Sequence, residues 1–130
     1  MFENLDIFRM STSMAKHAGH KQAVVAQNVA NADTPGYVAR DLLAFSDVYE
    51  PGSQGHMQRA TRAGHLNGGN AHAGYTSAEL ADTQSAPNGN RVSLETEMLK
   101  SVDAKRQHDR ALAIYKSALG LLRGALRTSG

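Results

Sequence analysis

Apolar side chains recur at helical spacing along the C-terminal third of the chain. Alternating steps of four and three define what we call the leucine stripe, which consists of Leu94, Met98, Ser101, Lys105, His108, Leu112, Tyr115, Leu119, Leu122 and Leu126. A second set, which we call the alanine column, recurs every seven residues beside it and consists of Ala104, Ala111, Ala118 and Ala125. Small alanines beside leucines let another helix approach closely, as in a coiled coil. The pattern predicts a helical segment over residues 92–130 whose apolar face serves as an intramolecular core, as a contact between subunits, or as both.

The N-terminal end predicts a second long helix, from about Leu5 to Asn31, within a segment of residues 1–32. Its predicted stripe consists of Ile7, Ser11, Met14, Ala18, Gln22, Val25 and Val29. The steps from 7 to 18 to 29 are eleven residues long, which is closer to a straight helix than to a strict heptad. Gly19 lies inside this pattern, and glycine costs a helix about 1 kcal/mol relative to alanine. We therefore expect another helix to pack closely at Gly19.

The middle segment, residues 33–91, has a different composition. Seven of the twelve glycines lie between residues 52 and 90, where large apolar side chains are scarce. Such a stretch buries too little surface to offset its chain entropy, so it predicts a glycine-rich loop or a small β-hairpin. Only residues 41–49 carry enough apolar side chains to anchor against the helices.

Helix length decides the expected architecture. A helix over residues 92–127 would be about 54 Å long at 1.5 Å per residue, whereas a compact chain of this size is a sphere roughly 36 Å across. The helix does not fit inside a globule of its own chain. The expected fold is therefore mainly α, with long N- and C-terminal helices forming an elongated, coiled-coil-like pair.

Composition narrows the possible chemistry. The 130-residue chain has no cysteine, a net charge of +2 and basic residues interleaved with acidic ones, so disulfides and thiolate metal sites are excluded and nucleic-acid binding is disfavoured. The N-terminus lacks the apolar segment and cleavage site of a secretory signal peptide. His56, His65 and His72 are spaced nine and seven apart, and His17 and His20 lack a third ligand in sequence, so no metal site is expected. No nucleophile motif or phosphate loop is present, and we expect neither catalysis nor a cofactor.

The most informative stretch is residues 27–45, where the first helical pattern stops. Thr34 precedes a proline and is pushed out of the α region. Pro35 and Gly36 supply the fixed and the positive φ of a type II turn that ends at Tyr37. Upstream, the amides of Asn28 and Asn31 either cap the helix end or bond a neighbouring subunit, and Asn31 is an expected left-handed helix terminus. The candidate turn set is Asn28, Asn31, Thr34, Pro35, Gly36, Tyr37, Arg40 and Asp41.

This stretch resembles the conserved segment of bacterial flagellar axial proteins, most closely the short proximal subunits of the basal-body rod. Residues 88–95, Asn-Gly-Asn-Arg-Val-Ser-Leu-Glu, are similar to the segment that leads into the last helix of that family, and residues 61–66 match it more weakly. Gln27 and Val38 depart from the family pattern outside the turn. The resemblance implies a structural subunit that assembles helically and transmits torque.

The same resemblance implies the partners and the route of the chain. Partners would be other copies of itself, adjoining rod subunits, the rod-to-ring adaptor protein and the export gate, with no nucleic acid or small-molecule substrate. The subunit would leave through the flagellar type III apparatus and reside in the basal body, in the periplasm. Phe45 and Tyr49 have the aromatic-x3-apolar form associated with export recognition. Expected helix–helix assembly residues are Leu94, Met98, Ala104, Ala111, Leu112, Tyr115, Ala118, Leu119, Leu122, Ala125 and Leu126.

Two alternatives stay open from the sequence. Another axial subunit, the second proximal rod protein, would lack the turn at residues 34–37. A small basic helical protein that binds nucleic acid would need a one-sided basic face, whereas Lys105, Arg106 and Arg110 are interleaved with Asp103 and Asp109. A peptidoglycan-cleaving enzyme is a weaker third possibility, since no paired acidic site supports it.

Overall fold

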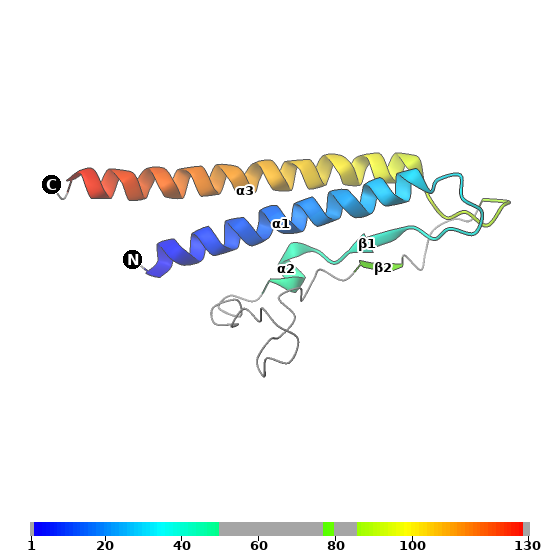
Figure 1. Ribbon diagram of the computed structural model, residues 1–130, viewed down its shortest axis with the longest axis horizontal. Helices are drawn as coiled ribbons and strands as arrows, with labels where there is room; N and C mark the ends of the chain where they lie inside the picture. The colour runs from blue at the N-terminus through cyan, green and yellow to red at the C-terminus, as the bar shows by residue number, and fades with distance from the viewer. Residues whose placement is uncertain (1, 50–76, 80–85, 129–130) are drawn as a thin grey trace, which may run out of the picture.

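The computed structural model describes residues 2–49, 77–79 and 86–128. Two long helices, α1 (Phe2–Ala30) and α3 (Leu94–Thr128), lie side by side and antiparallel, so that both chain termini are at one end and the connections are at the other (Figure 1). At 35 residues, α3 is about 52 Å long. The predicted fold class, mainly α with an elongated pair of terminal helices, is confirmed.

Local sequence explains where the helices begin and end. Ser93 precedes α3, and its hydroxyl accepts a hydrogen bond from the Thr96 hydroxyl at 3.1 Å while its carbonyl accepts from the Glu97 amide at 3.0 Å. α1 ends one residue before Asn31, whose side-chain amide donates to the Gln27 carbonyl one turn back, at 2.8 Å. The expectation that Asn31 is left-handed is wrong, because no described residue other than glycine has a positive φ.

The contact between α1 and α3 is made by small side chains. Ala104, Ala111 and Ala118 are buried along α3, and the facing positions of α1 include Ser11 and Ala18. Alanine and serine let two helix axes approach more closely than leucine would. The alanine column therefore forms the intramolecular contact, except for Ala125, which is exposed near the end of α3.

The buried positions of α1 correct its predicted stripe. Ser11, Ala18 and Val25 are buried at steps of seven, whereas Ile7 and Val29 are 37% and 42% exposed. The packed face therefore follows the heptad of a coiled coil and not the predicted eleven-residue step. Gly19 is exposed, and a Cβ placed on it would meet nothing within 4 Å, so the expected close helix contact is absent from the described residues.

The leucine stripe lies beside the alanine column and is largely open to solvent. The exposed members include Leu94, Met98, Leu112, Tyr115 and Leu126, while Leu119 and Leu122 are half-buried. Tyr115 also makes an edge-to-face contact with Phe8 of α1, with ring centroids 5.0 Å apart. The stripe thus lines a flank of the helix pair, because the antiparallel partner occupies the neighbouring alanine face.

The described residues that follow the turn lie along α1 (Figure 1). β1 (Arg40–Leu42) and β2 (Ser77–Glu79) pair antiparallel, with Arg40 opposite Glu79 and Leu42 opposite Ser77, and α2 (Phe45–Val48) follows β1 (Figure 1). A parallel bridge joins Val38 to Arg91. The predicted glycine-rich loop lies mostly outside the described residues, so the alternative of loop or hairpin stays a prediction. No helix among the described residues is long and apolar enough to cross a membrane.

Candidate functional site

The turn predicted at residues 34–37 forms as expected. The Tyr37 amide donates to the Thr34 carbonyl at 3.3 Å, which closes a four-residue turn. Gly36, the third residue of the turn, has a φ of +72°, as a type II turn requires. The Thr34 hydroxyl also donates to the Asn31 side-chain oxygen at 3.2 Å. These bonds fix the direction in which the chain leaves α1.

The segment that precedes α3 docks on this turn. The Asn90 side-chain amide is buried and donates to the carbonyls of Asn31 and Thr34, at 2.9 and 2.7 Å. The backbone adds two bonds, from Gly36 to the Asn88 carbonyl at 3.2 Å and from Arg91 to the Tyr37 carbonyl at 2.8 Å. Asn90 therefore adds a second hydrogen bond to two carbonyls of the segment after α1, which also accept from the backbone amides of Thr34 and Tyr37.

Two left-handed glycines meet where the segments touch. Gly89 has a φ of +79°, and a Cβ on it would lie 3.5 Å from the Gly36 Cα. Both positions favour glycine, because a side chain is strained at such φ values. We call this meeting point of residues 28–37 and 88–97 the junction.

Asn28 lies at the centre of the junction and is completely buried. Its amide nitrogen donates to the Arg40 carbonyl at 2.7 Å and to the Glu97 carboxylate at 2.9 Å. Its oxygen accepts from the Arg40 amide at 3.0 Å and from the Tyr37 hydroxyl at 3.2 Å. An asparagine amide has two donor and two acceptor positions, and all are used within the chain. Asn28 therefore has no capacity left for a neighbouring subunit.

Four charged side chains continue the junction along the helices. Lys100 lies 3.1 Å from both Asp41 and Glu97, and Lys21 lies 3.9 Å from Asp41. Burial alone would lower the pKa of Lys100, but hydrogen bonds and charge attraction from Asp41 and Glu97 outweigh it and raise that pKa above its ordinary value. Two cations and two anions balance, so the cluster ties β1 to both long helices without a net charge.

His17 holds the chain that follows β1 against the helix pair. Its ring is buried, with Nε2 at 2.9 Å from the Leu43 carbonyl and Nδ1 at 3.0 Å from the Gln107 amide nitrogen. A neutral ring that carries its proton on Nε2 matches both partners. Burial lowers the pKa of His17 below 6.5, against the opposing effect of the Leu43 carbonyl. The neutral form is therefore the one that fits this site.

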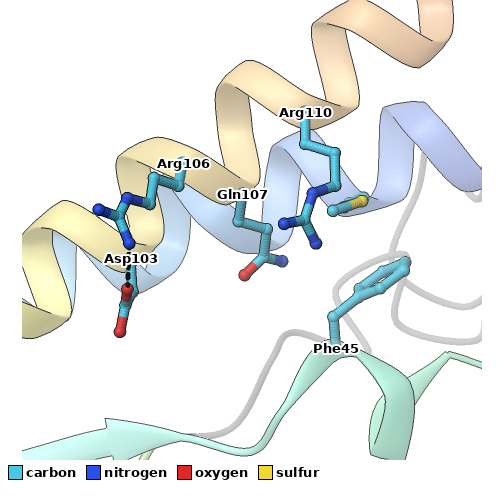
Figure 2. A pocket seen from close by; sticks show the side chains of 6 residues that line it. Phe45, Asp103, Arg106, Gln107 and Arg110 are labelled. Carbon is cyan, nitrogen blue, oxygen red and sulfur yellow. Dashed lines mark ion pairs between the residues drawn. The ribbon is translucent and has the colours of Figure 1, made fainter.

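The two aromatic residues proposed for export recognition lie next to His17. The Phe45 ring is 5.6 Å from the His17 ring and 5.1 Å from the Tyr49 ring, measured between centroids. Above Phe45 is an open pocket of about 380 Å³, into which Gln107 and Arg110 point from α3 (Figure 2). Phe45 is only half-exposed in the folded chain.

These arrangements hold separate segments of the chain together. The described residues contain no group of three or more side chains able to hold a metal ion, and His56, His65 and His72 lie outside them. Glu97 and Asp41 are each bound to Lys100. What the site achieves is to join α1, β1 and α3 through buried polar contacts.

Sequence reasoning identified part of this site. It put Asn28, the turn at 34–37, Arg40 and Asp41 in one set; the structure places Asn28 and the turn in the junction, and Arg40 and Asp41 next to it in β1. Glu97 was not among the expected site residues, yet its side chain is buried against Asn28. Sequence reasoning treated His17 only as a failed metal ligand. The sequence offered one signal for Glu97 and His17: each is a polar side chain on a helix face whose other members are small.

Comparison with known proteins agrees with the resemblance. Residues 10–37 match the family model described as flagella basal body rod protein. The chain is 31% identical over 121 residues to the flagellar basal body rod protein FlgB of Agrobacterium fabrum, covering 87% of each chain. It is also 31% identical over 78 residues to the protein of the same name from Bacillus subtilis, covering 60% of each.

Proposed function

Because this chain belongs to the flagellar basal-body rod proteins and is a structural subunit of the rod, we propose that it forms the proximal part of that rod, where copies assemble helically and transmit torque. The proposal rests on one observation: α3 has one face packed against α1 and a neighbouring apolar face exposed to solvent. The alanine column is buried against α1, and the adjacent leucine stripe is left largely exposed.

An open leucine face is costly for an isolated chain and useful for a polymer. Met98 and Leu126, near opposite ends of the stripe, are each 67% exposed. Burial of a leucine or methionine side chain contributes about 1.5–3 kcal/mol. Stacking further subunits on this face would recover that free energy, and many such lateral contacts would carry torque without any reaction.

The middle positions of the leucine stripe are polar, and this limits which kind of partner surface can cover it. Lys105 is exposed and bound to Asp109 at 2.7 Å, and Ser101 and His108 are half-buried. A partner on this flank would therefore meet apolar side chains at both ends and polar ones at the centre. That pattern suits a neighbouring subunit better than the dry core of a monomer.

The proposed partners are other copies, adjoining rod subunits, the rod-to-ring adaptor protein and the export gate. Export through the flagellar type III apparatus without a cleaved signal, to the periplasmic basal body, requires a partly unfolded chain. The contact of Phe45 with His17 supports this order of events, since a gate that reads Phe45 and Tyr49 would need the segment free of the helices. The helices would then order as they pack between subunits.

The test places one charge on the stripe. Leu119→Asp or Leu122→Asp puts an unpaired carboxylate into a contact that assembly would bury, at a cost of several kcal/mol. Cells should make and secrete the subunit but lose swimming. Ala113→Asp is the matched control, because Ala113 is exposed outside the stripe. Normal swimming with both leucine variants would refute the stripe as an assembly surface.

The alternatives have less support. The second proximal rod protein would lack the turn that Thr34 and Gly36 form here. A nucleic-acid-binding role is not supported, because Lys105 and Arg106 lie beside Asp109 and Asp103, at 2.7 and 3.9 Å. These acids remove the one-sided basic face that phosphate binding needs.

A further inference from the structure

The segment that docks on the turn at residues 34–37 contains an asparagine followed by a glycine, Asn88 and Gly89. This pair is chemically reactive, because the backbone nitrogen that follows an asparagine can attack the carbon of its side-chain amide, Cγ. Glycine favours the attack, since it has no Cβ to shield its nitrogen and its backbone is the least restricted. The Asn88 side chain is exposed to solvent, so water reaches it.

The reaction that follows needs only water. The Gly89 nitrogen gives up its proton and bonds to Asn88 Cγ, while the side-chain nitrogen takes up that proton and leaves as ammonia. Water then opens the resulting succinimide ring at one of its two carbonyl carbons. Opening at Cγ gives aspartate, and opening at the main-chain carbonyl gives isoaspartate, in which the backbone runs through the former side chain.

Hydrogen bonds hold both reacting groups in the folded chain. The Gly89 amide donates to the Ala86 carbonyl at 2.8 Å, which closes a four-residue turn. The Asn88 side-chain oxygen accepts from the Asn90 amide at 3.1 Å, as in an Asx turn. Attack requires both bonds to break, because the Gly89 nitrogen and Asn88 Cγ must turn toward each other. The reaction therefore depends on local opening of this turn.

Contacts with the end of α1 keep the turn closed. The Asn88 main-chain carbonyl accepts from the Gly36 amide at 3.2 Å. The buried amide of Asn90 donates to the carbonyls of Asn31 and Thr34, at 2.9 and 2.7 Å. The turn cannot move away from these partners unless the junction opens with it.

We propose that Asn88 is a deamidation site, which reacts while the junction is open and is protected while it is closed. Isoaspartate at this position prevents closure, because the carbonyl that accepts from Gly36 becomes a carboxylate outside the main chain and the backbone gains one carbon. Aspartate keeps both acceptors in place. The amount of isoaspartate therefore increases with the time that the chain spends open, and this holds whatever the chain assembles into.

Rates in the folded and the unfolded chain test the protection. The purified full chain is kept in buffer and in concentrated urea at one pH, and its peptides are analysed by mass spectrometry for aspartate and isoaspartate. Asn67 is also followed by glycine and serves as the reference for intrinsic reactivity in urea. There the two asparagines should react within about threefold of each other, and Asn88 should react at least about tenfold more slowly in buffer than in urea.

Asn90→Ala tests whether docking supplies this protection. The variant removes the donors to Asn31 and Thr34 and leaves the reactive pair unchanged. Deamidation of Asn88 should accelerate on the order of tenfold in buffer and stay the same in urea. Asn31→Ala is the matched control, because it removes a more exposed amide near the junction and should change the rate by less than about threefold. If Asn90→Ala does not fold, the comparison of the wild type in buffer and in urea still decides.

Three results would overturn the proposal. Asn88 that reacts as fast in buffer as in urea, or at the same rate in the folded Asn90→Ala chain as in the wild type, would remove the protecting role of the junction. Asn88 that stays intact in urea while Asn67 reacts would remove the site itself. Finally, the isoaspartate chain, separated by chromatography, should melt several degrees below Asn88→Asp. Equal melting temperatures would show that isoaspartate does not disturb the junction.

Discussion

Asn28 in α1 and Glu97 in α3 are 69 residues apart in sequence and share a buried hydrogen bond of 2.9 Å. The same amide also binds both backbone groups of Arg40. One side chain therefore fixes the relative positions of both long helices and β1. Because burial makes each of these polar groups costly to leave unpaired, the junction specifies a single arrangement of the chain.

Asn28→Asp tests that role. The change replaces a donor with a second carboxylate facing Glu97, and we expect it to lower the free energy of unfolding by about 2–4 kcal/mol. Adding Glu97→Gln should recover about half of the loss, because glutamine can donate to the new carboxylate. Asn31→Asp, at a more exposed amide, should cost less than about 1 kcal/mol. Thermal loss of the helical signal measures all three, and equal losses at positions 28 and 31 would contradict the account.

Gly36 tests the turn. At a φ of +72°, valine should cost about 2 kcal/mol, whereas asparagine visits this region more easily and should be partly tolerated. A Cβ at Gly36 would meet nothing within 4 Å, so backbone strain alone separates the two variants. Pro35→Ala should do less harm, since it loosens the turn without forbidding it. Swimming and the amount of secreted subunit are the measurements, and the requirement for positive φ fails if the valine variant swims as well as the asparagine one.

The alanine column sets the spacing of the helices. Ala111 is 1% exposed, so Ala111→Leu should force α1 and α3 apart and destabilise the pair by about 1–3 kcal/mol. Ala113→Leu changes the same residue type at an exposed position two residues away and should be nearly neutral. Thermal unfolding followed by circular dichroism compares the two. If they melt together, small side chains are not what holds α1 against α3.

The stability of the folded chain should depend on pH through His17. Burial lowers its pKa below 6.5 in the folded chain, with Lys21 and His20 acting in the same direction and the Leu43 carbonyl and Asp41 opposing. The unfolded chain then binds the proton first as pH falls, so stability is complete above about pH 6.5 and is lost as pH drops through the folded pKa. His17→Gln should flatten the melting temperature between pH 5 and 7.5, whereas His20→Gln should retain the slope. An unchanged slope in the His17 variant would rule out this origin.

The helices, their approximate bounds and the turn could be predicted because each depends on local pattern: periodicity for α1 and α3, and Pro35-Gly36 for the turn. The choice of packed face could not. α3 has two adjacent heptad sets, and hydrophobicity alone favours Leu112 over Ala111, whereas close approach of α1 requires the alanine. The contacts of Asn28 with Glu97 and of His17 with Gln107 join residues 69 and 90 positions apart, which no local pattern reveals.

We propose above that this chain is a proximal rod subunit held in the rod through its leucine stripe. Electron micrographs of purified basal bodies, with the subunit tagged and localised, test it most directly. We expect the label at the membrane-proximal end of the rod for the wild type, and we expect rods to be missing when the only copy carries Leu119→Asp. Basal bodies with complete rods that contain no label, or rods that form normally from the Leu119→Asp chain, would contradict it.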